Sequence, residues 1–181
     1  MTEIDVVRTY LEMNSPSQLK SIPLDRRAHV EHAVACTVSF FRYLYREVGA
    51  QYHWRDRLVW TDEQCRARLD TPGVAIWVLF TEGTPAGYFE LEKRGDGSVE
   101  IVYFGLMPEF VGRGLGKQML SAAVERAWEM TASRVWLHTC TLDNPAALPN
   151  YLKRGFTAFK TETFTAPAHV PVPVSAAPPP A

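Results

Sequence analysis

The most informative segment of the sequence is Val111-Gly112-Arg113-Gly114-Leu115-Gly116-Lys117, which lies between a predicted strand and a predicted helix. Three glycines in five positions let the backbone approach a ligand closely and point successive N–H groups into one concavity. At a helix N-terminus such a nest binds phosphate oxygens through unsatisfied donors and the positive end of the helix dipole. This glycine loop (residues 111–117) therefore predicts an anion site, with a turn that merely needs glycine as the alternative.

Two common phosphate-binding patterns do not fit the glycine loop. The dinucleotide pattern G-x-G-x-x-G fails because Lys117 stands where its last glycine belongs when the count starts at Gly112. Starting at Gly114 puts Met119 at that position. The nucleoside-triphosphate pattern fails because Gln118, rather than Ser or Thr, follows the Gly-Lys pair.

The segments on either side of the glycine loop predict an α/β protein. Apolar runs and alternation predict strands at 4–13, 74–80, 86–93, 99–106, 134–139 and 156–164, the first of them at a sheet edge. Helical spacing and capping signals predict helices at 24–48, from Thr61 to before Pro72, at 114–130 and at 145–153. This order favours a mixed sheet with helices on its faces.

Three motifs in register resemble the GNAT acetyltransferase superfamily. Its pyrophosphate loop follows the pattern Gln/Arg-x-x-Gly-x-Gly/Ala, which residues 111–116 match except at Val111. The strand at 100–108 and the Asn…Tyr…Gly-Phe segment at 144–156 also resemble the family. The resemblance covers about residues 74–164 and implies a mixed, mostly antiparallel central sheet with helices on both faces.

The resemblance implies acetyl-coenzyme A as co-substrate, direct transfer to an amine, and no metal. Pro149 is a second departure, because a proline early in a helix removes a hydrogen bond and leaves the position of Tyr151 open. The residues assigned to the coenzyme are Phe104, Gly105, Leu106, Val111, Gly112, Arg113, Gly114, Leu115, Gly116, Lys117, Asn144 and Tyr151.

Three residues are candidates for the proton transfers that amide formation needs. Glu100 resembles the family's catalytic base in its spacing to the glycine loop, and alternation puts it on an apolar face with Val102 and Phe104. The alternative is a solvated glutamate after a turn. Glu90 is a second candidate, as base or as binder of a cationic substrate. Tyr151 resembles the family's general acid, and a packed helix tyrosine is the alternative.

The acceptor side has the weakest sequence signal. Aromatic residues that follow the first long helix, Tyr52 and Trp54, are candidates for caging an amine or for covering the core. His138 and Cys140 end a predicted strand, and a hydrogen-bonded histidine there is favoured over a metal ligand. The basic residues and the histidine near this segment are Arg46, His53 and Arg57.

Composition restricts the partners. The chain has 181 residues, a net charge of −1 and three widely spaced cysteines, which favours a small-molecule or peptide amine over nucleic acid and a reducing cytoplasm over secretion. No run is apolar enough to span a membrane. We expect one domain at 1–164, compatible with a homodimer, and a Pro/Ala-rich tail at 165–181 that is disordered or serves for docking. The alternative function is a non-catalytic acyl-coenzyme A binding module, and a metal hydrolase built on His138 is disfavoured.

Overall fold

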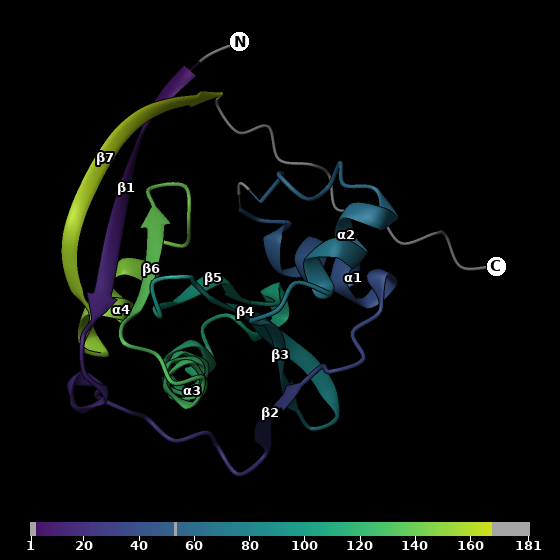
Figure 1. Ribbon diagram of the computed structural model, residues 1–181, viewed down its shortest axis with the longest axis horizontal. Coiled ribbons are helices and arrows are strands. Elements are labelled where there is room, and N and C mark those ends of the chain that lie inside the picture. Colours follow the sequence, from purple (N-terminus) through teal and green to yellow (C-terminus); the bar gives the residue numbers. More distant parts are fainter. Residues whose placement is uncertain (1–2, 53, 168–181) are drawn as a thin grey trace.

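A seven-stranded sheet forms the centre of the molecule (Figure 1). The computed structural model describes residues 3–52 and 54–167. The strands are β1 (Glu3–Met13), β2 (Ala28–His32), β3 (Val74–Thr81), β4 (Thr84–Lys93), β5 (Val99–Leu106), β6 (Val135–Cys140) and β7 (Thr157–Pro167). The helices are α1 (Val38–Gly49), α2 (Asp62–Leu69), α3 (Leu115–Glu129) and α4 (Ala147–Lys153), with 3₁₀ turns at Pro16–Gln18 and Pro108–Phe110.

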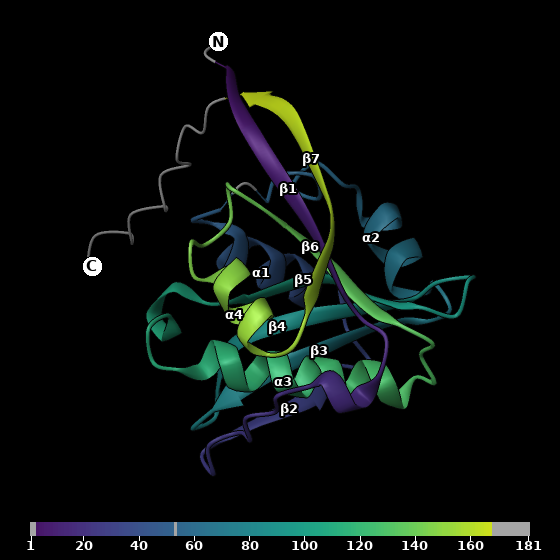
Figure 2. The ribbon, with the colours of Figure 1, turned by 90° about the vertical axis from the view of Figure 1, so that its left-hand side faces the viewer.

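The strands follow the order β2-β3-β4-β5-β6-β1-β7, and only the β5–β6 neighbours are parallel. These two strands pair at Val99↔Val135 and Glu100↔Trp136 and nowhere further along. Beyond Glu100 the sheet therefore opens between β5 and β6. In Figure 2 the long β1–β7 ribbon crosses in front of the other strands, and α3 runs across the lower part of the view, just above β2.

Helices cover both faces of the sheet and define two cores. On one face α3 and α4 pack against Leu11, Phe89 and Leu137, among others. On the other face α1 and α2 pack against Ile76, Val78 and Tyr88. The sheet thus separates the side that carries the glycine loop from the side that carries the α1–α2 connection.

The first predicted helix, 24–48, is wrong in its first half. Residues 28–32 form β2, which pairs antiparallel with β3. The helix begins only at Val38, because the Thr37 side chain accepts a hydrogen bond from the Phe40 N–H and caps it there. The pattern of apolar residues continued across this boundary and did not indicate the change.

The strand predicted at 4–13 forms as β1, but its expected place at a sheet edge is wrong. It lies between β6 and β7, antiparallel to both, and the edges are β2 and β7. Alternation identifies the buried face of a strand but not its partners. The last strand continues to Pro167, three residues past the expected boundary, and the rest of the predicted tail lies outside the described residues.

Several local predictions are confirmed. Thr61 and Gln64 form a capping box at the start of α2. Helix α4 begins late, at Ala147, so Pro149 falls in its first turn. Backbone N–H groups in the first turn have no acceptor within the helix, so the missing N–H of the proline costs no helical hydrogen bond there. Within the described ranges, no helix has the length and apolar character needed to cross a membrane.

Candidate active site

The opening between β5 and β6 holds a cavity of about 770 Å³. Residues from both faces of the sheet line it, because the missing β5–β6 pairs leave a passage through the sheet. The glycine loop and α4 lie at one end, called here the donor side. The 50–61 segment, β1 and β7 lie at the other, called the acceptor side.

The donor side is built largely from backbone. Gly112 and Gly114 have φ angles of +82° and +77°, which favour glycine, and a Cβ at Gly112 would meet only open space. Gly114 is also the N-cap of α3 and supplies no side-chain cap, so the first N–H groups of the helix have no side-chain acceptor from that residue. Lys117 lines the cavity beside them. These features are compatible with the predicted anion site, which stays a prediction.

One edge of β5 adds further backbone groups. Residues Ile101 to Leu106 pair with β4 on one side, yet they have no partner strand on the side that faces β6. Phe104, Gly105 and Leu106 line the cavity, as predicted. Their free peptide groups offer hydrogen bonds to an extended ligand lying between the two strands.

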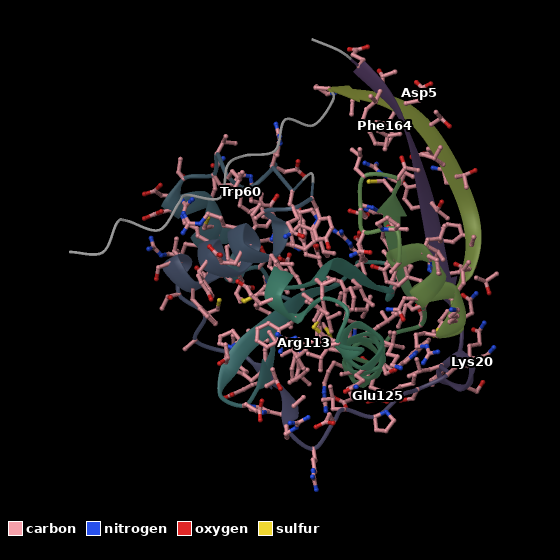
Figure 3. The ribbon with its side chains drawn as sticks, turned by 180° about the vertical axis from the view of Figure 1, so that it is seen from behind. Asp5, Lys20, Trp60, Arg113, Glu125 and Phe164 are labelled. Carbon is pink, nitrogen blue, oxygen red and sulfur yellow. The ribbon has the colours of Figure 1, made fainter. Side chains whose placement is uncertain are left out.

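Two residues assigned to the coenzyme do not line the cavity. The Arg113 guanidinium lies over the Phe110 ring, 5.0 Å from its centre. Figure 3 labels Arg113 near the start of α3. Leu115 is buried in the core under α3. The cations that do reach the cavity from this side are Lys117, Lys153 and Arg154.

Tyr151 and Asn144 both line the cavity. Burial raises the pKa of the Tyr151 phenol, and its ring packs edge-on against Phe104 and Phe156. Asn144 is not the helix N-cap, which is Ala146. Its Oδ1 accepts from the Ala146 N–H, and its Nδ2 donates to the Tyr52 hydroxyl at 3.0 Å, so this bond links the donor side to the 50–61 segment.

The acceptor side is built from side chains of distant segments. Tyr52, Trp54 and Asp56 line it from the α1–α2 connection, and the Trp54 ring also packs against Tyr88 and Tyr103. Arg8 from β1 and Phe164 from β7 line it opposite. Figure 3 labels Phe164 on the β7 side of the molecule. It labels Trp60, a residue of the α1–α2 connection, on the α2 side. His53 lies outside the described residues, and Arg46 is exposed beside Glu47.

Glu90 lies at the centre of a buried ion-pair network and not on the cavity. Its side chain is fully buried, and its two oxygens accept from Arg57 at 2.5 and 2.9 Å and from Arg68 at 2.5 and 2.7 Å. Arg68 also binds Glu92 at 2.7 Å. With both oxygens engaged by two guanidinium groups, Glu90 is positioned to hold Arg57 rather than to accept a proton from a substrate.

Glu100 does not share a face with Val102 and Phe104, so that prediction is wrong. The β4–β5 register shifts between Glu90 and Leu91, which leaves Val102 without a Cα partner, and this bulge reverses the alternation. Glu100 instead lies on the face of Glu92, where Arg94 binds one carboxylate oxygen. Its other oxygen is 3.9 Å from His138 Nε2.

His138 is the titratable group that lies between Glu100 and the cavity. Its side chain is 39% exposed, lines the cavity, and lies 5.6 Å from the Tyr10 ring. Burial lowers the pKa of His138, and the Glu100 carboxylate opposes this effect. The lowered pKa favours the neutral form of the imidazole. Among residues 3–52 and 54–167, no group of three or more His, Cys, Asp or Glu side chains could hold a metal ion.

Cys140 also lines the cavity, on the same strand as His138. Burial raises the pKa of its thiol, and the nearby Asp143 raises it further. A thiol in this state is a poor nucleophile at neutral pH. The three cysteines are free.

The sequence did not indicate the residues that β1 and β7 bring to the acceptor side. Arg8, Asp56 and Phe164 were not predicted, and His138 was considered only as a strand-end residue or a metal ligand. These residues come together only because β1 lies between β6 and β7. The hydrogen bond between Tyr10 and Glu162, for example, joins residues that are 152 positions apart in the sequence.

Comparison with known proteins identifies the family. Residues 39–156 match the model of the acetyltransferase (GNAT) family, and the chain belongs to that family. The sequence is 31% identical over 110 residues to an uncharacterized N-acetyltransferase from the pepI 3′ region of Lactobacillus delbrueckii subsp. lactis. That match covers 57% of this chain and 63% of the relative.

Two solved structures have the same fold. A GCN5-related N-acetyltransferase from Kribbella flavida superposes with a TM-score of 0.66 at 16% identity, over 90% of this chain and 58% of that one. A GCN5-related N-acetyltransferase from Sphaerobacter thermophilus gives a TM-score of 0.66 at 12% identity, over 89% of this chain and 50% of that one. The chain thus spans less than two thirds of these relatives. The predicted resemblance and the predicted fold class are confirmed, and the enzyme class that the motifs predict is the one this family defines.

Proposed function

We propose that the protein transfers an acetyl group from acetyl-coenzyme A directly to a primary amine of a small molecule or peptide. The observation that carries this proposal is the single cavity that joins the glycine loop to an acceptor side containing His138. A donor and an acceptor that enter from opposite faces of the sheet would meet at the opening between β5 and β6.

The donor side fits the chemistry of a coenzyme A thioester. The glycine loop offers N–H groups and Lys117 to a pyrophosphate. The free edge of β5, from Ile101 to Leu106, offers peptide groups to the amide-containing arm and one N–H to polarise the thioester carbonyl. Holding the donor along this edge would fix its reactive carbon relative to the acceptor.

His138 is the proposed proton acceptor for the attacking amine. It lines the cavity, and its lowered pKa keeps the imidazole neutral and able to take a proton. Glu100, the sequence-based candidate, lies behind it and would stabilise the imidazolium that forms. Glu100 is thus proposed as a positioning residue, and Glu90 as a structural member of the ion-pair network.

Tyr151 is the proposed donor of a proton to the departing thiolate. Its hydroxyl stays protonated at neutral pH because burial raises its pKa. It lines the donor side close to Phe104, on the free edge of β5. Tyr151→Phe should therefore lower kcat more than it weakens acetyl-coenzyme A binding.

One observation favours the alternative of a non-catalytic acyl-coenzyme A binding module. Val111, exposed on the cavity, stands where the family pattern has Gln or Arg. An apolar residue there supplies no hydrogen bond to the pyrophosphate. The neutral His138 and the open acceptor side argue for catalysis instead.

Calorimetry and thiol release test the proposal together. We expect acetyl-coenzyme A to bind, and free thiol to be released above the hydrolysis rate when a primary amine from a panel is added. No binding at millimolar ligand would contradict both functions. Binding without release for any amine in the panel would favour the binding module.

A further inference from the structure

We propose that the acceptor carries a carboxylate close to its amine, as a free amino acid does, and that Arg8 binds this carboxylate. The inference rests on the proposed function and adds the class of acceptor. It follows from the place of Arg8 in the fold, from its lack of an acidic partner, and from its position relative to His138.

Arg8 lies where an acceptor would enter. Its Cα is opposite Cys140 on β6 and opposite Glu162 on β7, so the side chain stands between the two strands that border the acceptor side. It lines the cavity together with Phe164, whose ring is 4.8 Å from the centre of the guanidinium. This stacking orients the plane of the guanidinium, and because its Nε is buried only the terminal N–H groups are left for a ligand.

Arg8 has no acidic partner within the described ranges. Its Nε is buried and makes no hydrogen bond, and no ion pair involves its guanidinium. The acid across β7, Glu162, is bound by Tyr10 and Lys160. Asp143, which also lines the cavity, accepts from Thr139 and from the Cys140 N–H.

Four arginines near this part of the sheet are paired, whereas Arg154, which lines the donor side of the cavity, is in no ion pair within the described ranges. Arg57 and Arg68 bind Glu90, Arg94 binds Glu92 and Glu100, and Arg134 binds Glu12. A guanidinium that lines a cavity without a carboxylate retains donors that a ligand can satisfy. Carboxylates match the planar donor fork of arginine in two-point hydrogen bonds.

The short separation of Arg8 and His138 indicates that the carboxylate bound by Arg8 and the amine deprotonated by His138 belong to one small molecule. Arg8 is opposite Cys140, and Tyr10 is opposite His138, so the two side chains are one alternation apart on the same face, about 7 Å along the strands. The positive charge of Arg8 also contributes to lowering the pKa of His138, which agrees with this proximity. The aromatic residues Tyr52, Trp54 and Phe164 would surround an apolar side chain.

The test uses three matched acceptors, L-phenylalanine, L-phenylalaninamide and 2-phenylethylamine, together with the corresponding leucine set and an N-terminally free dipeptide. Thiol release gives kcat/KM for the wild type and for Arg8→Met. Each acceptor is compared with itself in the two proteins, so differences in amine basicity cancel. We expect Arg8→Met to lower kcat/KM about 10- to 100-fold for the amino acids, the size of a charge-assisted hydrogen-bond pair, and less than about 3-fold for the amides and amines.

Arg126→Met is the matched control. Arg126 also stacks on an aromatic ring, 5.3 Å from Trp77, and its Nε is also buried without a hydrogen bond, but it lies on α3 and does not line the cavity. It should change none of the ratios. Arg8→Lys should retain part of the preference for the amino acids, because it keeps the charge and loses the planar fork. Acetyl-coenzyme A affinity and the melting temperature verify that each variant is folded.

Equal loss for acids, amides and amines in Arg8→Met would overturn the inference, and so would a wild type that acetylates amines but no amino acid. A dipeptide that depends on Arg8 as strongly as the amino acids do would also overturn it, because its carboxylate lies further from the amine. These results leave the proposed function intact. Absence of acetyl-coenzyme A binding, or of release with every amine, would refute the proposed function itself.

Discussion

The donor side and the acceptor side of the cavity are built in different ways. The donor side is one continuous segment, in which the end of β5, the glycine loop and the start of α3 present mainly backbone groups. The acceptor side gathers side chains from β1, the α1–α2 connection, β6 and β7. The family match at 39–156 includes the whole donor segment and excludes β1 and β7. The donor side thus lies wholly within the family match, and part of the acceptor side lies outside it.

The largest expected effect concerns His138, the proposed base on the acceptor side. His138→Gln should lower kcat/KM about 100-fold or more, which is the usual contribution of a general base. The wild type should lose activity as the pH falls through the His138 pKa, which burial sets below 6.5, because the imidazolium cannot accept a proton. The pH profile of the variant should lack this loss of activity at acidic pH. It should keep the loss that protonation of the substrate amine causes. The charged and titratable groups that face His138 are Glu100, Arg8, Tyr10, Asp143 and Glu162.

His29→Gln is the control for that substitution. His29 also lies 3.9 Å from a glutamate, Glu31, and stacks on an aromatic ring, Phe80, but it is on β2 and does not line the cavity. Its pH profile should match the wild type. An unchanged acidic limb in His138→Gln would assign the base to another group.

The second prediction tests whether Glu90, which does not line the cavity, has a structural or a catalytic role. Glu90→Gln should lower the free energy of unfolding by about 3 kcal/mol, because it leaves Arg57, 6% exposed, without its charged partner. Urea denaturation measures this loss, and Glu31→Gln, at an exposed glutamate, should cost far less. The pH profile of the folded variant should keep its acidic limb. Loss of that limb would make Glu90 the base.

The third prediction tests whether backbone geometry alone supports the donor side. Gly114→Val should weaken acetyl-coenzyme A binding about 10- to 100-fold, because valine disfavours a φ of +77° and the loop must rearrange. Gly83→Val is matched, since Gly83 has a φ of +84° and open space around it, yet lies in the β3–β4 turn. It should lose stability and retain the affinity measured by calorimetry. Equal affinities for the two variants would contradict a backbone-based site.

The smallest effect is expected at the bond between the two sides. Tyr52→Phe removes the acceptor of the Asn144 Nδ2 hydrogen bond, worth about 1 kcal/mol, and should raise KM for the amine about 5-fold. Tyr43→Phe is the control, because the Tyr43 hydroxyl contacts only the Met107 sulfur at 3.8 Å among the described residues. A fall in kcat with unchanged KM would instead place Tyr52 in the chemical step.

Several local features of the fold were predicted well because their signals lie in neighbouring residues. Glycines at positive φ, the capping box of α2 and the late start of α4 are all properties of neighbouring residues. The acceptor side was predicted poorly because its parts meet only in the folded sheet. The bulge at Val102 moved Glu100 to the other face, and the place of β1 brought in Arg8, and neither effect has a signature in the local pattern.

The place of β1 also constrains the order of folding. Both of its neighbours, β6 and β7, come more than a hundred residues later, as the 134-residue separation between Val7 and Thr141 illustrates. Contacts between distant residues form slowly, because a long loop must close first. On a ribosome the donor segment is complete while β1 still waits for its partners. The β1–β6 and β1–β7 pairs, which border the cavity, can therefore form only after the donor segment has been synthesised.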